Sequence, residues 1–356
     1  MFHWINHIVV AIAMLFIMAV VISKAADQLG DALHVLGIKL KIPNSVRGAT
    51  FDAVSSSFPE FSTAMVAVIV YKQFTDIGLP TIAGSGIFNI LLIPMLSIFV
   101  YRGSQVLKAD KASIYRDMLF YSVSILALIF MAYTGQFTFI SGIILIGIYV
   151  VYIITLSVQS KKYSDNMTLG EEIGIKAELQ QELEEEGEES EFIDMSYKKI
   201  FSIVIVTMTI IWVSTDAIVQ SAIVVSETLK IPTFIVSVVI LAACTSIPDT
   251  LLSIKSAKLG DADGAVSNAV GSNIFDICIC LGVPMLIAGK SIPVNLSENL
   301  IIFVFLILSM LTTALILLKK NGAKRSDTFF MGAVYVCFII YIVCVGLTII
   351  PLNAFV

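Results

Sequence analysis

Charged residues are scarce in this chain. Of its 356 residues, 14% are charged and 58% are hydrophobic, whereas a soluble domain carries about 25% charged and about 45–50% apolar residues. So large an excess of apolar side chains needs lipid to cover it, which excludes an ordinary soluble protein. We therefore expect an integral membrane protein surrounded by a lipid bilayer.

Histidine and cysteine are also scarce. The three histidines form no metal-binding motif and no serine nucleophile has a plausible base, so we expect no catalytic centre and a protein that is not an enzyme. The five cysteines lie in apolar stretches without paired spacing, and we interpret them as packing residues. We expect no cofactor, no nucleic-acid partner and no obligate protein partner.

Ten apolar stretches are long enough to cross a membrane, since a helix of about 20 residues spans a hydrocarbon core of about 30 Å. They predict helices at 3–24, 46–72, 78–101, 114–134, 138–159, 200–225, 233–257, 264–288, 298–318 and 328–350. We interpret the first as a retained helix, because Met1 to Ala13 contains no Lys or Arg. The predicted fold is an all-α membrane protein with ten transmembrane helices.

The basic residues predict an orientation. Of the 22 Lys and Arg, 19 fall in loops after odd-numbered helices and three, Lys72, Lys230 and Lys290, fall in the opposite loops. Basic loops stay on the cytoplasmic side, so both termini are expected outside. The membrane is expected to be the plasma membrane of a prokaryote. Residues 161–199 include an acidic run from Glu182 to Glu191 that cannot enter a bilayer, which predicts a cytoplasmic linker.

The chain contains an internal duplication. Asp27 matches Asp216 and Pro59-Glu60 matches Pro248-Asp249, all 189 residues apart. The segment 84–89 matches 271–276 at a separation of 187. The predicted domains are a first five-helix repeat (1–160), the acidic linker (161–199) and a second repeat (200–356). Because five is odd, the second repeat starts on the opposite side of the membrane, a common plan for secondary transporters.

Four of the predicted helices contain polar clusters. Each proline removes a backbone donor and frees carbonyls upstream, so Pro59 and Pro248 are expected to interrupt the second and seventh helices. Three-residue spacing places Ser57 beside Glu60 and Ser246 beside Asp249. Four-residue spacing does the same for two further pairs: Ser85 with Asn89, and Ser272 with Asp276. Repeat symmetry predicts that the four pairs meet at the centre.

The resulting set of three carboxylates, one amide oxygen, four hydroxyls and free carbonyls describes a site for a hard cation. Ca²⁺ accepts 6–8 oxygens in flexible geometry, whereas Mg²⁺ requires a strict octahedron and gives up water reluctantly. Na⁺ also accepts hydroxyl and carbonyl oxygens, and overlapping sites would make the two ions mutually exclusive, as antiport requires. The alternative for any single hydroxyl is a structural role at a helix kink. Asp27 and Asp216 are expected near helix ends, in structural roles.

At these motifs the sequence resembles the cation/calcium exchanger superfamily, whose repeats carry Gly/Ser-Ser/Thr-Ser-x-Pro-Glu/Asp and Gly-Ser-x-x-x-Asn/Asp signatures. Residues 255–284 look most like the potassium-dependent sodium/calcium exchangers. Asp249 replaces a Glu usual in prokaryotic relatives, and Ser55 and Cys244 stand where Gly is frequent.

The resemblance implies the ion-binding roles. For Ca²⁺ it implies Glu60, Asp249, Asn89 and Asp276. For Na⁺ it implies Ser57, Ser85, Ser246 and Ser272, helped by carbonyls near Ser56 and Thr245. It also implies that the first and sixth helices move during alternating access.

The interpretation is an electrogenic antiporter that extrudes Ca²⁺ in exchange for Na⁺, with K⁺ as a further candidate ion. A Ca²⁺/H⁺ antiporter, in which protons replace Na⁺, is the main alternative. A passive cation channel and an intramembrane enzyme are weaker ones.

Overall fold

The computed structural model describes residues 2, 4–40, 48–101, 106–166 and 195–346, and these are mostly helical. The helical segments of the first half are α1 (Ile8–Lys39), η1 (Gly48–Asp52), α3 (Ala53–Val66), η2 (Ala67–Tyr71), η3 (Phe74–Gly78), α4 (Leu79–Val100), α5 (Lys111–Tyr133) and α6 (Phe139–Asn166). Residues 167–194, most of the predicted linker, lie outside the described part of the chain.

The helical segments of the second half are α9 (Tyr197–Leu229), α10 (Thr233–Val236), η4 (Ser237–Leu241), α11 (Ala242–Thr245), α12 (Ile247–Leu259), α13 (Ala262–Phe275), η5 (Asp276–Cys280), α14 (Gly282–Ile287), α15 (Leu296–Leu317), η6 (Arg325–Asp327) and α16 (Thr328–Gly346). Across the two halves, η1 to η5 are π-helical turns and η6 is a 3₁₀ turn.

The predicted set of ten spans is confirmed. Within the described residues, nine helices are long and apolar enough to cross a membrane. A tenth span is made of two pieces, Thr233–Thr245 and Ile247–Leu259, which meet at an angle of 42°. Many large apolar side chains on the outer faces of these spans are exposed in the structure. A lipid bilayer would cover them.

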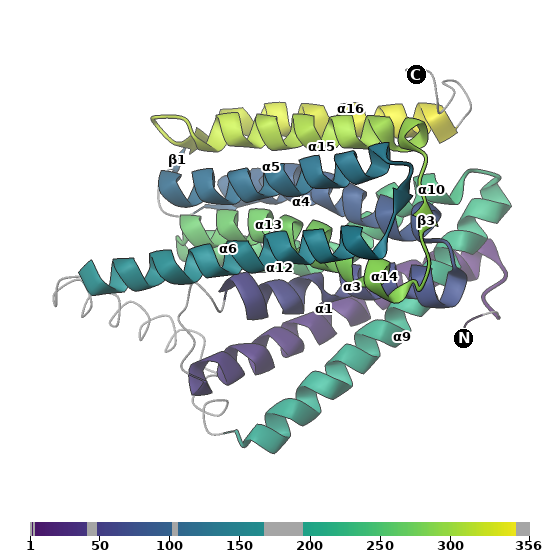
Figure 1. Ribbon diagram of the computed structural model, residues 1–356, viewed down its shortest axis with the longest axis horizontal. Coiled ribbons are helices and arrows are strands. Elements are labelled where there is room, and N and C mark those ends of the chain that lie inside the picture. Colours follow the sequence, from purple (N-terminus) through teal and green to yellow (C-terminus); the bar gives the residue numbers. More distant parts are fainter. Residues whose placement is uncertain (1, 3, 41–47, 102–105, 167–194, 347–356) are drawn as a thin grey trace.

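The two halves of the chain run in opposite directions. α1 begins at the end of the bundle marked N in Figure 1, whereas α9 begins at the other end, where α6 finishes. α1 and α9 pack against each other at one side of the molecule and are inclined to the remaining helices (Figure 1). The inverted relation of the two five-helix units therefore follows directly from the chain path.

α1 and α9 are longer than the sequence predicted. They contain 32 and 33 residues, and at 1.5 Å per residue each is about 48 Å long, well beyond a hydrocarbon core of about 30 Å. The expected end of the first helix at residue 24 is wrong, because its polar continuation packs against α9 instead of stopping. Asp27 and Asp216 consequently lie inside helices and not near their ends, and Asp216 accepts a hydrogen bond from Tyr71 Oη at 2.9 Å.

The two repeat-matched prolines have different effects. Pro248 follows the break at Ser246 and occupies the first turn of α12, as predicted. Pro59 lies inside α3, which continues through it, so the predicted interruption of the second span is wrong. The π-turns η1 and η2 flank α3 on the two sides of Pro59, and the Thr63 hydroxyl donates to the Pro59 carbonyl at 2.9 Å.

Close helix packing at the centre depends on a small residue. A Cβ at Gly84 of α4 would collide with the Val238 carbonyl of η4, so only glycine allows this approach. Two short antiparallel pairs tie loops together at the helix ends. β1 (Val106–Leu107) pairs with β4 (Ala323–Lys324), and β2 (Gln136–Phe137) pairs with β3 (Ile292–Pro293).

Candidate cation site at the centre of the bundle

The four predicted polar pairs converge inside the bundle. α3 supplies Ser57 and Glu60, α4 supplies Ser85 and Asn89, the α11–α12 junction supplies Ser246 and Asp249, and α13 with η5 supplies Ser272 and Asp276. Each of these eight side chains is at most 1% exposed. Elements from both repeats thus contribute polar atoms to one enclosed region.

Three carboxylates form the core of this region. Glu60, Asp249 and Asp276 each present an oxygen atom, and these atoms all lie within 4.8 Å of one another. All three side chains are fully buried. Buried like charges at this separation repel one another strongly, and burial removes the water that would screen them. The cluster therefore needs positive charge, supplied by metal cations or by protons.

Serine hydroxyl groups lie between the carboxylates Glu60 and Asp276. Glu60 Oε1 accepts hydrogen bonds from Ser85 Oγ and from Ser246 Oγ, both at 3.3 Å. The two hydroxyl oxygens lie 2.8 Å apart. Ser85 Oγ also lies 3.4 Å from Asp276 Oδ2. One hydroxyl thus reaches carboxylates from both repeats, so an ion bound here would touch both halves of the molecule.

Asp249 is held by donors from two helices. Its Oδ2 accepts from Asn89 Nδ2 at 3.0 Å, and its Oδ1 accepts from Ser272 Oγ at 2.8 Å. Asn268 fixes the backbone at the same point, because its amide donates to the Asp249 carbonyl at 3.1 Å and to Ser253 Oγ at 2.8 Å. These bonds orient the Asp249 carboxylate toward the centre before any ion arrives.

Three buried oxygens of the site make no hydrogen bond: Ser57 Oγ, Glu60 Oε2 and Asn89 Oδ1. Buried polar atoms are nearly always paired, so three unpaired oxygens beside three carboxylates call for a ligand. Each can donate a lone pair to a cation. Oxygen donors of these kinds, without imidazole, suit a hard ion such as Ca²⁺ or Na⁺.

Ser56 and Thr245 occupy a different position from the other predicted residues. Their hydroxyls bond back to their own helices: Ser56 Oγ donates to the Asp52 carbonyl at 2.9 Å, and Thr245 Oγ1 donates to the Leu241 carbonyl at 3.1 Å. Their side chains are therefore engaged locally. In this part of each helix, backbone carbonyls are the groups available to an ion. Pro59 and Pro248 have no N–H, so the carbonyl four residues before each proline receives no helical hydrogen bond from it.

The family described as "Sodium/calcium exchanger protein" matches the chain at residues 10–158 and again at residues 199–348. The chain belongs to this family. The resemblance found in the sequence motifs is thereby confirmed, and the exchanger is a transporter of Ca²⁺ and other cations and not an enzyme.

Named relatives of this exchanger include proteins from animals and bacteria. It is 28% identical to "Sodium/potassium/calcium exchanger 5" of Homo sapiens, covering 79% of this chain and 70% of that protein. It is 26% identical to "Inner membrane protein YrbG" of Escherichia coli K12, covering 81% of this chain and 84% of that protein. The match to human "Sodium/potassium/calcium exchanger 3" is 32% identical but covers 42% of this chain and 22% of that protein.

Solved structures share the exchanger's fold. The sodium-calcium exchanger NCX_Mj superposes with a TM-score of 0.61 at 19% identity, covering 93% of this chain and 97% of that one. The H⁺/Ca²⁺ exchanger CAX gives a TM-score of 0.61 at 11% identity, covering 95% of this chain and 88% of that one. The predicted architecture of ten helices in two inverted repeats is confirmed. The names of the two solved structures differ in the second ion: one names sodium and the other names H⁺.

Three residues beside the site were not predicted to belong to it. Cys280 Sγ donates to Asp276 Oδ1 at 3.5 Å, across the π-turn η5 that begins at Asp276. Asn273 donates to the Gly86 carbonyl at 2.9 Å and joins α13 to α4. Asn268 supports Asp249, as described above. Asn273 lies within the segment 271–276, and Cys280 follows Asp276 by four residues, the spacing that pairs Ser272 with Asp276. Both residues could therefore have been found from the sequence.

Proposed function

We propose that this exchanger transports Ca²⁺ in exchange for Na⁺ by alternating access, with the buried central site holding one kind of ion at a time. The single observation that carries the proposal is the convergence of three carboxylates, four serine hydroxyls and one amide in one enclosed region. Glu60, Asp249, Asn89 and Asp276 are the proposed Ca²⁺ ligands. Ser57, Ser85, Ser246 and Ser272 are the proposed Na⁺ ligands.

The donor set supports Ca²⁺ as the divalent ion. A site built from carboxylate, amide, hydroxyl and carbonyl oxygens on four separate helices can supply the 6–8 ligands that Ca²⁺ accepts. Mg²⁺ would have to lose water into a site without octahedral geometry, which it does reluctantly. The four serines beside the carboxylates support Na⁺ as the counter-ion, because hydroxyl and carbonyl oxygens satisfy a monovalent ion without further charge.

A Ca²⁺/H⁺ antiporter is the second candidate. Three buried carboxylates within 4.8 Å of one another would also be neutralised by protons, so release of Ca²⁺ could be coupled to proton uptake instead of Na⁺ binding. Coupling to K⁺ is a further possibility under the Na⁺ proposal, since one Ca²⁺ leaves a negative charge among three carboxylates. The three mechanisms differ in which gradient drives transport.

The orientation proposed for the exchanger places residues 161–199 in the cytoplasm and both termini outside. The distribution of Lys and Arg supports it. In a plasma membrane, exchange of several Na⁺ for one Ca²⁺ would carry net charge and drive Ca²⁺ outward. The division into repeats at 1–160 and 200–356 is part of the same proposal.

Uptake of Ca²⁺ into proteoliposomes tests the proposal. Vesicles loaded with Na⁺ and diluted into Na⁺-free medium should accumulate Ca²⁺, and a membrane potential set by K⁺ and valinomycin should change the rate. Vesicles with only a proton gradient should show none. Uptake driven by protons without Na⁺ would establish the second candidate, and uptake with no counter-ion would refute antiport. Omitting K⁺ on the Ca²⁺ side measures any K⁺ requirement.

A further inference from the structure

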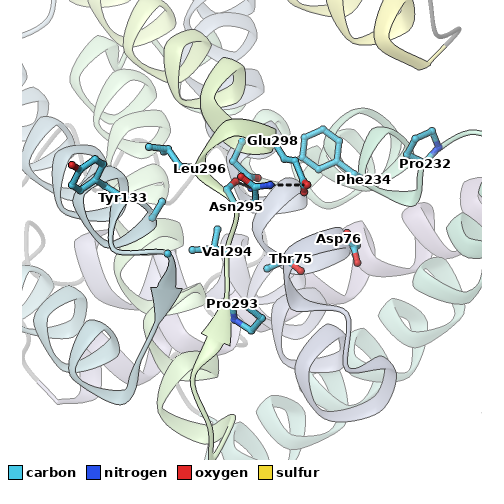
Figure 2. A pocket seen from close by; sticks show the side chains of 13 residues that line it. Thr75, Asp76, Tyr133, Pro232, Phe234, Pro293, Val294, Asn295, Leu296 and Glu298 are labelled. Atoms are coloured by element: carbon cyan, nitrogen blue, oxygen red, sulfur yellow. Dashed lines mark hydrogen bonds between the residues drawn. The ribbon is translucent and has the colours of Figure 1, made fainter. Parts of the chain in front are cut away.

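A cavity of about 740 Å³ opens at the end of the bundle where α1 begins. Residues from both repeats line it: two from η3 (75 and 76), three at the end of α5 and just after it (132, 133 and 135), two at the start of α10 (232 and 234), and six around the start of α15 (293–296, 298 and 299). Figure 2 shows Asp76 and Thr75 on one wall, and on another it shows Asn295, which caps α15, and Glu298, in the first turn of α15. None of these residues belongs to the central cation site.

Two carboxylates give this cavity a negative charge. Asp76 and Glu298 are both exposed to solvent, and they are near enough that the charge of Glu298 acts on Asp76. Glu298 Oε1 is held by Asn295 Nδ2 at 2.8 Å, the hydrogen bond drawn in Figure 2. Because the two acids come from different repeats, a cation between them would join the two halves at this surface.

A buried amide in the same cavity lacks a partner. Asn299 lines the cavity and is 5% exposed. Its Nδ2 donates to the Asn295 carbonyl at 2.9 Å, whereas its Oδ1 accepts no hydrogen bond. An acceptor oxygen this deeply buried is normally satisfied by a donor or an ion. The orphaned oxygen therefore points to a ligand independently of the two carboxylates.

We propose that this cavity is a second binding site, which holds a hydrated Ca²⁺ ion between Asp76 and Glu298 with Asn299 Oδ1 as a further oxygen partner. The cavity is much larger than a bare ion, since each water occupies about 30 Å³, so the ion keeps most of its water. Two exposed carboxylates and retained water make the site weak, and its effect is to concentrate Ca²⁺ at this surface. The identity of the ion rests on the proposed Ca²⁺ transport, whereas its binding does not require transport.

Binding is tested with Tb³⁺, a luminescent substitute for Ca²⁺, on the purified full chain in nanodiscs. The variant Glu60→Gln with Asp249→Asn removes the central site and leaves the cavity intact. Light absorbed by Tyr133, which lines the cavity, should excite bound Tb³⁺, and Ca²⁺ should displace the signal. Adding Asp76→Asn and Glu298→Gln should abolish it. Glu227→Gln, an exposed carboxylate outside the cavity, should leave it unchanged.

Two results would overturn the proposal: luminescence that persists after Asp76→Asn with Glu298→Gln, or luminescence that is lost equally with Glu227→Gln. Ca²⁺ uptake gives a second test, in which the central site is left unaltered. Asp76→Asn with Glu298→Gln should raise the Ca²⁺ concentration for half-maximal uptake from this side about tenfold at low salt, with the maximal rate unchanged. Absence of Ca²⁺ uptake by the unaltered protein would instead contradict the proposed function, and the Tb³⁺ result would stand by itself.

Discussion

Replacing Glu60 by Gln removes one charge from the central site with little change of shape. Glu60 Oε1 accepts from Ser85 and Ser246, each at 3.3 Å, while Oε2 makes no hydrogen bond. A glutamine can place its oxygen at the first position and its NH₂ group at the second, so both serine contacts survive. The substitution therefore separates the charge of Glu60 from its packing.

The magnitudes follow from the spacing of the carboxylates. Two unit charges 4.8 Å apart, the largest separation among these oxygens, repel each other by about 3 kcal/mol at an effective dielectric constant of about 20. Without Ca²⁺, the Gln variant should therefore have a higher free energy of unfolding than the unaltered protein, by up to this amount for each charged neighbour, and should unfold at a higher temperature. With Ca²⁺, loss of one buried partner of the ion should cost about 3–5 kcal/mol, or roughly 10²- to 10⁴-fold in affinity.

Thermal unfolding in nanodiscs measures both effects. The unaltered protein should gain stability when Ca²⁺ replaces a chelator, by about 2.7 kcal/mol at a hundredfold excess over its dissociation constant. Glu60→Gln should lose this gain and show no Ca²⁺ uptake in proteoliposomes. Glu227→Gln, the same change at an exposed position, should retain both. Near-normal uptake by the Glu60 variant would refute the assignment of Glu60 as a Ca²⁺ ligand.

Three further predictions concern neighbouring residues. Ser57→Ala combined with Ser246→Ala should raise the Na⁺ concentration needed for half-maximal exchange more than the Ca²⁺ concentration; equal shifts in both titrations would argue against separate Na⁺ positions. Because Cys280 Sγ lies 3.5 Å from Asp276 Oδ1, Cd²⁺ should inhibit Ca²⁺ uptake. Cys280→Ser should raise the Cd²⁺ concentration for half-maximal inhibition at least tenfold. Unchanged inhibition would exclude the thiol as a ligand. Tyr71→Phe should lower the free energy of unfolding by about 0.6–1.7 kcal/mol through loss of its bond to Asp216, with Ca²⁺ affinity unchanged; a loss of affinity would place Tyr71 in the transport site.

The parts of the fold that depend on lipid could be predicted from the sequence. Hydropathy reports which segments need a hydrocarbon environment, and it located all ten spans. It does not report where a helix ends when the neighbour beyond the membrane is protein. For that reason the first helix was expected to stop at residue 24, although α1 continues to Lys39 alongside α9.

The central site could be predicted because two independent patterns agreed. Spacing put hydroxyl and carboxyl groups on common helix faces, and the duplication then required the four faces to meet. The geometry of the backbone between them could not be predicted in the same way. Pro59 and Pro248 match in the repeats, yet α3 continues and the α11–α12 junction bends by 42°. The outcome depends on which neighbouring groups satisfy the freed carbonyls, and these groups come from distant parts of the chain.

The one difference in charge between the matched pairs sets the charge of the site. Where the second repeat has Asp276, the first has Asn89, whose amide donates to Asp249 at 3.0 Å and thereby draws it inward. A carboxylate at position 89 could not donate this bond and would add a fourth like charge. With the amide, the three carboxylates balance three monovalent cations in full, whereas one Ca²⁺ leaves a single negative charge. Under the proposed Na⁺/Ca²⁺ exchange, the amide at position 89 would make the site neutral with three Na⁺ bound and leave one negative charge with Ca²⁺ bound, and this difference would make the proposed exchange respond to the membrane potential.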